Sequence, residues 1–194
     1  MPTDYQSFAF VITLAAVVNG LGIVRWLSGF AEYLRRRHSV QATHYWVFNL
    51  LAGYQFLLHI LFWWTLYSLR GAATINFLTF LYLLTGPILL FIGTAILLPD
   101  LDEDAIDLKE HFRATRPIYS TVLVLLWLWA IFSSPIMHGF FAPTLPLLTA
   151  FLASALVLRI STNQKIHAVV AVVNWLLLVS LIALYFMQLG GPNV

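Results

Sequence analysis

Long apolar segments dominate this chain, and charged residues rarely interrupt them. A bilayer core about 30 Å thick needs roughly 20 apolar residues in a helix, and six segments come close to that length. The spans of β-barrels are alternating stretches of about ten residues and do not fit such continuous runs. We therefore predict an all-α fold, a polytopic membrane helical bundle that forms a single domain. The six predicted transmembrane helices cover about residues 7–29, 45–69, 74–98, 117–138, 143–160 and 166–189.

The composition supports this class and excludes others. Only 9% of the 194 residues are charged, the mean hydropathy is +0.87, and 61% of the residues are hydrophobic. A soluble domain carries about 25% charged residues, because its surface must face water. Nucleic-acid binding would need a basic face on a supporting fold, and the sequence has neither. The chain has no cysteine, which excludes disulfides, thiolate metal sites and a cysteine nucleophile.

Basic residues predict the orientation in the membrane. Eight of the ten Lys and Arg residues fall in or beside the connections at residues 30–44, 99–116 and 160–165, whereas the opposite side has only Arg70. Loops rich in Lys and Arg stay in the cytoplasm. We therefore predict that both termini are non-cytoplasmic. The arginine cluster at residues 35–37 and the 99–116 connection should lie on the same side.

The 99–116 connection is an acidic cytoplasmic loop. Asp100, Asp102 and Asp104 match the first, third and fifth ligand positions of an EF-hand. Ala105 and His111 stand where that loop needs its glycine and its bidentate glutamate, so we reject an EF-hand, although a weaker divalent-cation site stays open.

The second part of this connection has a helical pattern. Ala105, Leu108 and Phe112 recur at i, i+3 and i+7, with charged residues around them. This pattern predicts a short amphipathic helix that lies on the inner membrane surface or on a partner. A solvated connector is the alternative.

Polar residues within the spans are the main candidates for function. Gln55 and His59 are one turn apart near the middle of the second span, and Asn49 precedes them. They could line a polar path, relay protons or, for His59, ligate a haem. The alternative is that they form hydrogen bonds across helices and hold the bundle together. We expect Gln55 and His59 to face the protein interior or a cavity, because lipid would leave their hydrogen bonds unmet.

Two further pairs of residues stand out. Gly86 and Pro87 lie at the middle of the third span, and proline removes a backbone donor, so we predict a helix hinge there. Arg25 and Glu32 are seven residues apart near the cytoplasmic end of the first span. We predict that they form an interfacial pair on one face of that helix.

No motif for catalysis or for a resident cofactor emerges. The chain has no phosphate-binding glycine loop, no GxSxG and no HExxH. Haem bound between two histidines needs two ligands at similar depth, and only His59 lies deep. We predict no catalytic residue, no metal site and no cofactor, with haem or quinone left open.

The middle third of the chain loosely resembles a group of uncharacterised bacterial multi-pass membrane proteins. The similarity rests on the aromatic stretch at residues 54–64 and on the stretch from Leu98 to Arg116. It implies a bacterial inner membrane and brings no known activity.

Three functions follow from these features, and none is an enzyme. The sequence favours a small channel or transporter that forms a homo-oligomer, with the polar residues of the second span in its path. One alternative is an accessory or scaffold subunit of a larger membrane complex. The other is a haem- or quinone-binding membrane protein.

Overall fold

The structure, a computed structural model, is an all-helical bundle, as the sequence predicts. It describes residues 2–36, 41–43, 45–68, 76–99 and 105–187. The helices are α1 (Pro2–Arg36), α2 (Trp46–Ser68), α3 (Phe77–Leu97), α4 (Leu108–His138), α5 (Leu145–Ile160) and α6 (Gln164–Leu181), and α6 continues as a π-helical turn, η1 (Ile182–Phe186).

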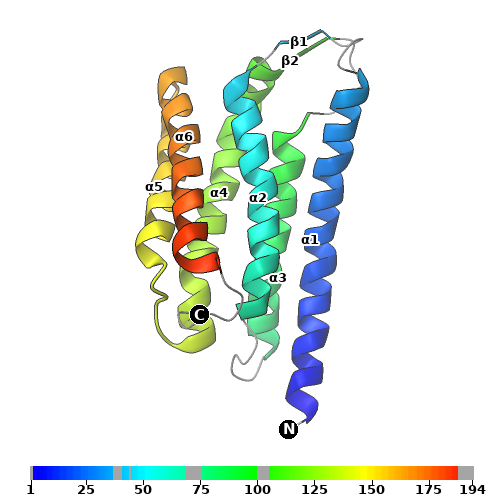
Figure 1. The fold of residues 1–194 in the computed structure, drawn as a ribbon, viewed down its shortest axis with the longest axis vertical. Helices are drawn as coiled ribbons and strands as arrows, with labels where there is room; N and C mark the ends of the chain where they lie inside the picture. The colour runs from blue at the N-terminus through cyan, green and yellow to red at the C-terminus, as the bar shows by residue number, and fades with distance from the viewer. Residues whose placement is uncertain (1, 37–40, 44, 69–75, 100–104, 188–194) are drawn as a thin grey trace.

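Figure 1 shows α1 on one flank of the bundle, α5 and α6 on the other, and α2, α3 and α4 between them. Two short strands, β1 (Gln41–Thr43) and β2 (Ala105–Asp107), pair in parallel at one end, which we call the strand end. This pairing joins the α1–α2 connection to the α3–α4 connection. The described parts of the two connections therefore lie at the same end, as the basic residues predict.

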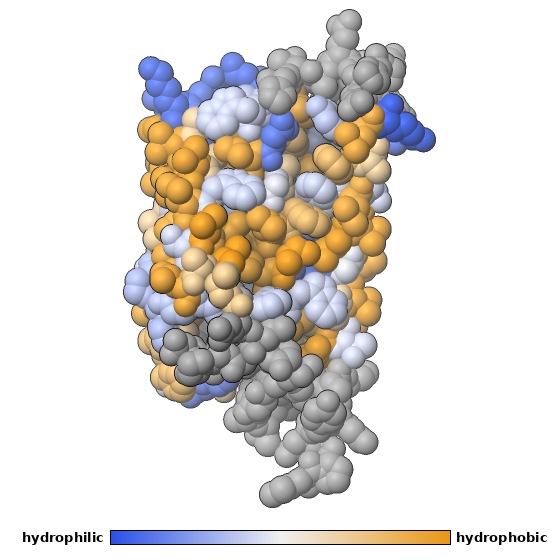
Figure 2. All heavy atoms as spheres, in the orientation of Figure 1, coloured by the Kyte–Doolittle hydropathy of each residue, from blue (hydrophilic) through white to orange (hydrophobic). Residues whose placement is uncertain are grey.

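Five helices, α1, α2, α3, α4 and α6, are long and apolar enough to cross a membrane. The 16 residues of α5 rise about 24 Å, which is less than the roughly 30 Å of a bilayer core. In Figure 1 α5 runs to the strand end, but it begins well short of the far end of the bundle, where α4 ends. Figure 2 shows hydrophobic side chains around the middle of the bundle and hydrophilic ones at the strand end. The architecture fits a multi-pass membrane protein, and the sixth crossing stays a prediction.

The prediction of a separate amphipathic helix within residues 105–116 was wrong. Ala105–Asp107 is a strand, and the helix that begins at Leu108 continues through Pro117 to His138. Its early start is explained by the Asp107 side chain, which accepts hydrogen bonds from the backbone N–H groups of the first turn. The apolar face does not lie on a membrane surface, because Leu108 and Phe112 are buried in the bundle core. The acidic residues 100–104 lie outside the described residues.

Tryptophan side chains join neighbouring helices. Three of them donate the indole N–H to a backbone carbonyl of another helix. The pairs are Trp26 with Ala52, Trp129 with Tyr82 and Trp175 with Leu50, at 2.9, 2.8 and 2.9 Å. Lipid is as apolar as the helices, so packing and interhelical hydrogen bonds must hold them together. These three bonds link α1 to α2, α4 to α3 and α6 to α2.

The predicted hinge residues have a packing role. Helix α3 continues across Gly86 and Pro87 without a break, and a bend at this point stays a prediction. A Cβ added at Gly86 would lie 2.5 Å from Cζ2 of Trp129, so glycine is what lets this indole reach α3. Tyr82 in turn donates its hydroxyl proton to the carbonyl of Trp129, so the two side chains link α3 and α4 by reciprocal hydrogen bonds.

Cysteine labelling tests the crossing of α5, because the natural chain has no cysteine. We expect Arg35→Cys, Lys109→Cys and Lys165→Cys to react with an impermeant maleimide from one membrane side, and Phe140→Cys to react from the other. Lys165 and Lys109 share a side only when α5 crosses. Labelling of Lys165→Cys from the side of Phe140→Cys would reduce the number of crossings to five or fewer.

Candidate functional site

Five polar side chains from four helices meet in the interior of the bundle, and we call this cluster the polar network. It consists of Asn19 from α1, Gln55 and His59 from α2, Thr94 from α3 and Tyr119 from α4. None of the five is more than 1% exposed. The structure therefore places Gln55 and His59 in the protein interior, as expected.

Small residues bring these helices close enough for the network to form. On α1 the buried stripe includes Ala15, Asn19 and Gly22, at helical spacing. A Cβ added at Gly22 would lie 2.2 Å from Cε1 of His59, which is closer than real atoms approach. On α3, a Cβ added at Gly93 would lie 3.1 Å from Nε2 of Gln55. Glycine on both neighbouring helices therefore makes room for the two polar side chains of α2.

The partners of His59 define its tautomer. Nδ2 of Asn19 donates to the His59 carbonyl at 3.1 Å, so Oδ1 of Asn19 is the acceptor that lies 2.7 Å from Nδ1 of His59. His59 must then carry a proton on Nδ1. Its Nε2 lies 2.8 Å from Oγ1 of Thr94, whose single hydroxyl proton can go to this nitrogen or to the Leu90 carbonyl at 3.1 Å. The shorter contact favours His59, and the Leu90 carbonyl still accepts from Gln55. This arrangement fits a neutral imidazole with both nitrogens hydrogen-bonded, as inferred from the pattern of donors.

Gln55 completes the network. Its Nε2 donates to the Leu90 carbonyl at 3.0 Å and to Oγ1 of Thr94 at 3.3 Å. Its Oε1 accepts the hydroxyl proton of Tyr119 at 3.2 Å. Each side-chain oxygen and nitrogen of Gln55 and His59 therefore has a partner. A buried polar cluster stabilises a single arrangement when all its members are satisfied in this way.

The other predicted site residues lie apart from the network. Asn49 is exposed and lines a cavity nearer the strand end. Arg25 donates to the Leu98 carbonyl at 3.4 Å, and Glu32 forms an ion pair with Arg35. The spacing of seven residues put Arg25 and Glu32 on one face of α1 but two turns apart, and Arg35 lies only three residues from Glu32.

Sequence reasoning missed three members of the network. Asn19, Thr94 and Tyr119 are ordinary residues for a membrane span when each is considered in its own helix. A signal existed for Asn19, which is flanked by small residues at i−4 and i+3 (Ala15 and Gly22). Such a stripe is typical of a close helix–helix contact.

The geometry limits the chemistry of the network. Axial ligation of haem by His59 does not fit, because both ring nitrogens already have partners and the side chain is fully buried. Among the described residues, no group of three or more His, Asp or Glu side chains is placed to hold a metal ion. The arrangement acts as a hydrogen-bonded lock between α1, α2, α3 and α4.

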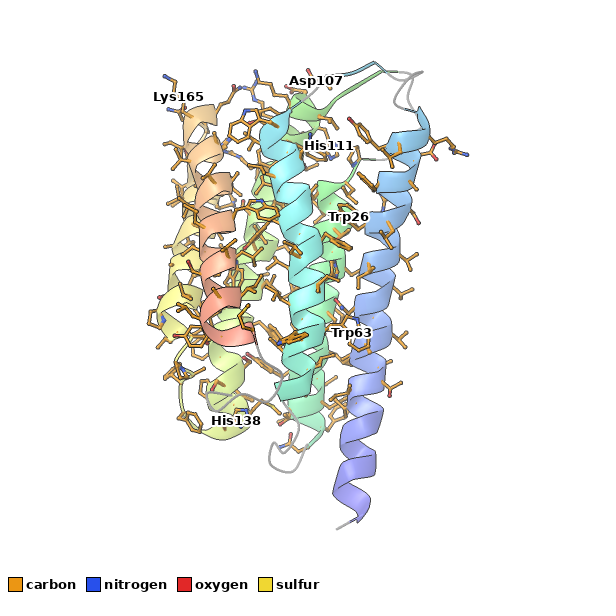
Figure 3. All side chains as sticks on the ribbon, viewed as in Figure 1. Trp26, Trp63, Asp107, His111, His138 and Lys165 are labelled. Carbon is orange, nitrogen blue, oxygen red and sulfur yellow. The ribbon has the colours of Figure 1, made fainter. Side chains whose placement is uncertain are left out.

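A cavity of about 360 Å³ lies between α1 and α2 towards the strand end. Its walls are aromatic and come from Trp26, Phe30 and Tyr33 of α1 and from Phe48 of α2, with Asn49 as a polar group in the lining. Figure 3 labels Trp26, which lies in the half of the bundle towards the strand end. Its ring stacks on Phe30, with 5.1 Å between the ring centroids.

No protein-family model matches this chain, and neither a curated protein nor a solved structure matches it. The function must therefore be argued from the geometry of the chain itself.

Thr94→Val tests the polar network, because valine keeps the shape of threonine and removes the hydroxyl. We expect a loss of about 1–2 kcal/mol in the free energy of unfolding in detergent, because Nε2 of His59 loses its donor. Thr85→Val is the matched control, because Thr85 is exposed on the same helix and its hydroxyl donates to the Leu81 carbonyl of its own helix. It should change the stability by less than about 0.5 kcal/mol. Equal effects of the two substitutions would contradict a structural role for the network.

Gly22→Ala tests the close approach of α1 to His59. The added methyl group has no room, so we expect destabilisation by about 1–3 kcal/mol and broadened NMR signals for the His59 ring. Gly20→Ala, two residues away, meets nothing within 4 Å and should be neutral or stabilising by up to about 1 kcal/mol, because alanine favours a helix. A stable Gly22→Ala variant would show that α1 does not pack against His59 in this way.

Proposed function

We propose that this chain is a multi-pass protein of the bacterial inner membrane that binds a membrane quinone in the cavity between α1 and α2. The observation that carries the proposal is the cavity itself, with its aromatic walls and its polar groups at the strand end. Its volume of about 360 Å³ lies within the usual range of small-molecule sites, roughly 300–1,000 Å³.

The chemistry of the lining selects the ligand class. A quinone head group is a flat apolar ring with carbonyl oxygens that accept hydrogen bonds. Trp26, Phe30 and Phe48 contribute aromatic rings to the lining, and Tyr33 and Asn49 are lining residues whose side chains carry hydrogen-bond donors. Arg25 lies beside it, since its Nη1 is 3.7 Å from the position of a Cβ on Gly29. A guanidinium has five N–H groups, so it can donate to the Leu98 carbonyl and to a ligand at the same time.

The position of the cavity also suits a quinone. It lies among the last turns of α1 and the first turns of α2, at the end of the bundle where Arg35 and Lys109 lie. By the positive-inside rule this end is cytoplasmic, and both termini are then non-cytoplasmic. A head group at this depth leaves an isoprenoid tail free to extend into the hydrocarbon region.

The geometry supports quinone binding better than a path through the second span. A channel or transporter that used Gln55 and His59 would have to expose them to water, and both are buried with their hydrogen bonds satisfied. Binding at the α1–α2 cavity needs no such opening. It requires no second copy of the chain, and it is compatible with a subunit of a larger complex.

Quenching of tryptophan fluorescence by decylubiquinone in nanodiscs tests the proposal. We expect saturable quenching of the natural protein. Ala52→Leu should weaken binding at least about tenfold, because Ala52 lines the cavity and a larger side chain fills it. Tyr33→Phe should weaken it about threefold to tenfold, through loss of one hydrogen bond.

Ala95→Leu is the control, because it adds the same side chain at an exposed position on α3. It should bind as the natural protein does. Quenching that rises linearly with quinone, and equally in Ala52→Leu, would reflect partition into the lipid and would overturn the proposal.

A further inference from the structure

Positive charge is uncompensated in the second half of the chain. From His111 to Val194 the sequence contains no Asp or Glu, whereas it contains Arg113, Arg116, Arg159 and Lys165. Arg113 contacts Glu110 at 4.0 Å, on the exposed side of α4. The other three belong to the region where α4, α5 and α6 meet at the strand end, and Figure 3 shows Lys165 at this end of α6.

Arg116 is the centre of this region. It is 9% exposed, and its Nε is buried without a hydrogen-bond partner. Among the described residues, no carboxylate lies within 4 Å of its guanidinium. A buried cation without a counter-charge is costly, so such a group marks a place where an anion is expected.

Among the described residues the guanidinium has one hydrogen-bond partner, and that partner is shared. Nε2 of His167, on α6, lies 2.9 Å from Nη1 of Arg116 and also 2.9 Å from the carbonyl oxygen of Ser161. A ring nitrogen holds either a lone pair or a proton, so it can accept from Arg116 or donate to Ser161, but not both. If Nε2 accepts from Arg116, the Ser161 carbonyl loses this donor. If Nε2 donates to Ser161, Nη1 of Arg116 loses this acceptor, and an external acceptor would satisfy the arginine.

The surroundings add positive potential. Arg159 lies in the last turn of α5 and donates from Nε to Oγ1 of Thr121, which is five residues after Arg116 on α4. Lys165 and His167 stand in the first turn of α6, which has no acidic residue. Basic residues at a helix N-terminus oppose the helix dipole, whereas an anion there is stabilised.

We propose that Arg116, Arg159 and Lys165 form a binding site for a phosphate group where α4, α5 and α6 meet, with the head group of an anionic phospholipid as its occupant. Arginine and lysine are the residues that recognise phosphate, and a basic pocket between helices on the cytoplasmic side is a suitable place for a lipid head group. Inorganic phosphate has the same chemistry, and the experiment separates the two sources. The site involves other helices than the quinone cavity and does not depend on it.

The test measures binding of phosphatidylglycerol, phosphatidylcholine and inorganic phosphate to the purified protein in a zwitterionic detergent. Native mass spectrometry counts bound lipid, and the thermal midpoint of unfolding reports phosphate. We expect at least about tenfold tighter binding of phosphatidylglycerol than of phosphatidylcholine. Arg116→Gln should lower that affinity about tenfold or more, as expected for a charge-assisted hydrogen bond. Arg159→Gln and Lys165→Gln should lower it about fivefold each.

Arg35→Gln is the matched control, because it removes a positive charge at the strand end on α1, on the opposite flank of the bundle from α5 and α6. It should keep the natural affinity. Protection by inorganic phosphate that Arg116→Gln abolishes, without a lipid preference, would keep the phosphate site and assign it to free phosphate. Equal binding of both lipids with no effect of phosphate would overturn the proposal, as would equal losses in control and site variants. If Arg116→Gln does not fold, the two exposed site variants decide the outcome.

Discussion

Hydrocarbon neither accepts nor donates hydrogen bonds, and it provides no hydrophobic drive for one apolar helix to leave lipid for another. A bundle of this composition must therefore satisfy its interior polar groups within the protein and use those same bonds to join its helices. The polar network does both. Asn19, Gln55, His59 and Thr94 have their partners in one another and in backbone carbonyls, and the bonds run from α1 through α2 to α3.

Glycine placement follows from the same constraint. At three helix contacts the residue that faces a large side chain of the next helix is glycine: Gly22 faces His59, Gly86 faces Trp129 and Gly53 faces Trp175. A Cβ at any of these positions would lie 3.2 Å or less from the facing side chain. Polar or indole groups and glycines thus act in pairs, each glycine providing the space that the bond on the opposite helix requires.

The sequence predicts features that depend on a single helix, and it misses contacts that depend on how two helices pack. The apolar segment at residues 45–69 became α2 almost to the residue, and Gln55 and His59 are buried because exposure to lipid is costly. Their partners Asn19, Thr94 and Tyr119 come from other helices, and a single sequence does not say which faces meet. The start of α4 was misplaced because Pro117 resembled a boundary, whereas the Asp107 cap sets the boundary ten residues earlier.

Ligand binding is favoured where polar groups are not all used to join the helices. At mid-bundle every side-chain polar atom of Gln55 and His59 has a hydrogen-bond partner, so neither residue is left to recognise a ligand. Towards the strand end the chain combines features that a packed core avoids, namely an aromatic cavity beside Arg25 and a buried Arg116 with an unpartnered Nε. Helix α2 borders the cavity, and the network fixes its position against α1. The polar network therefore preorganises the cavity wall, whose shape would change if α1 could slide along α2.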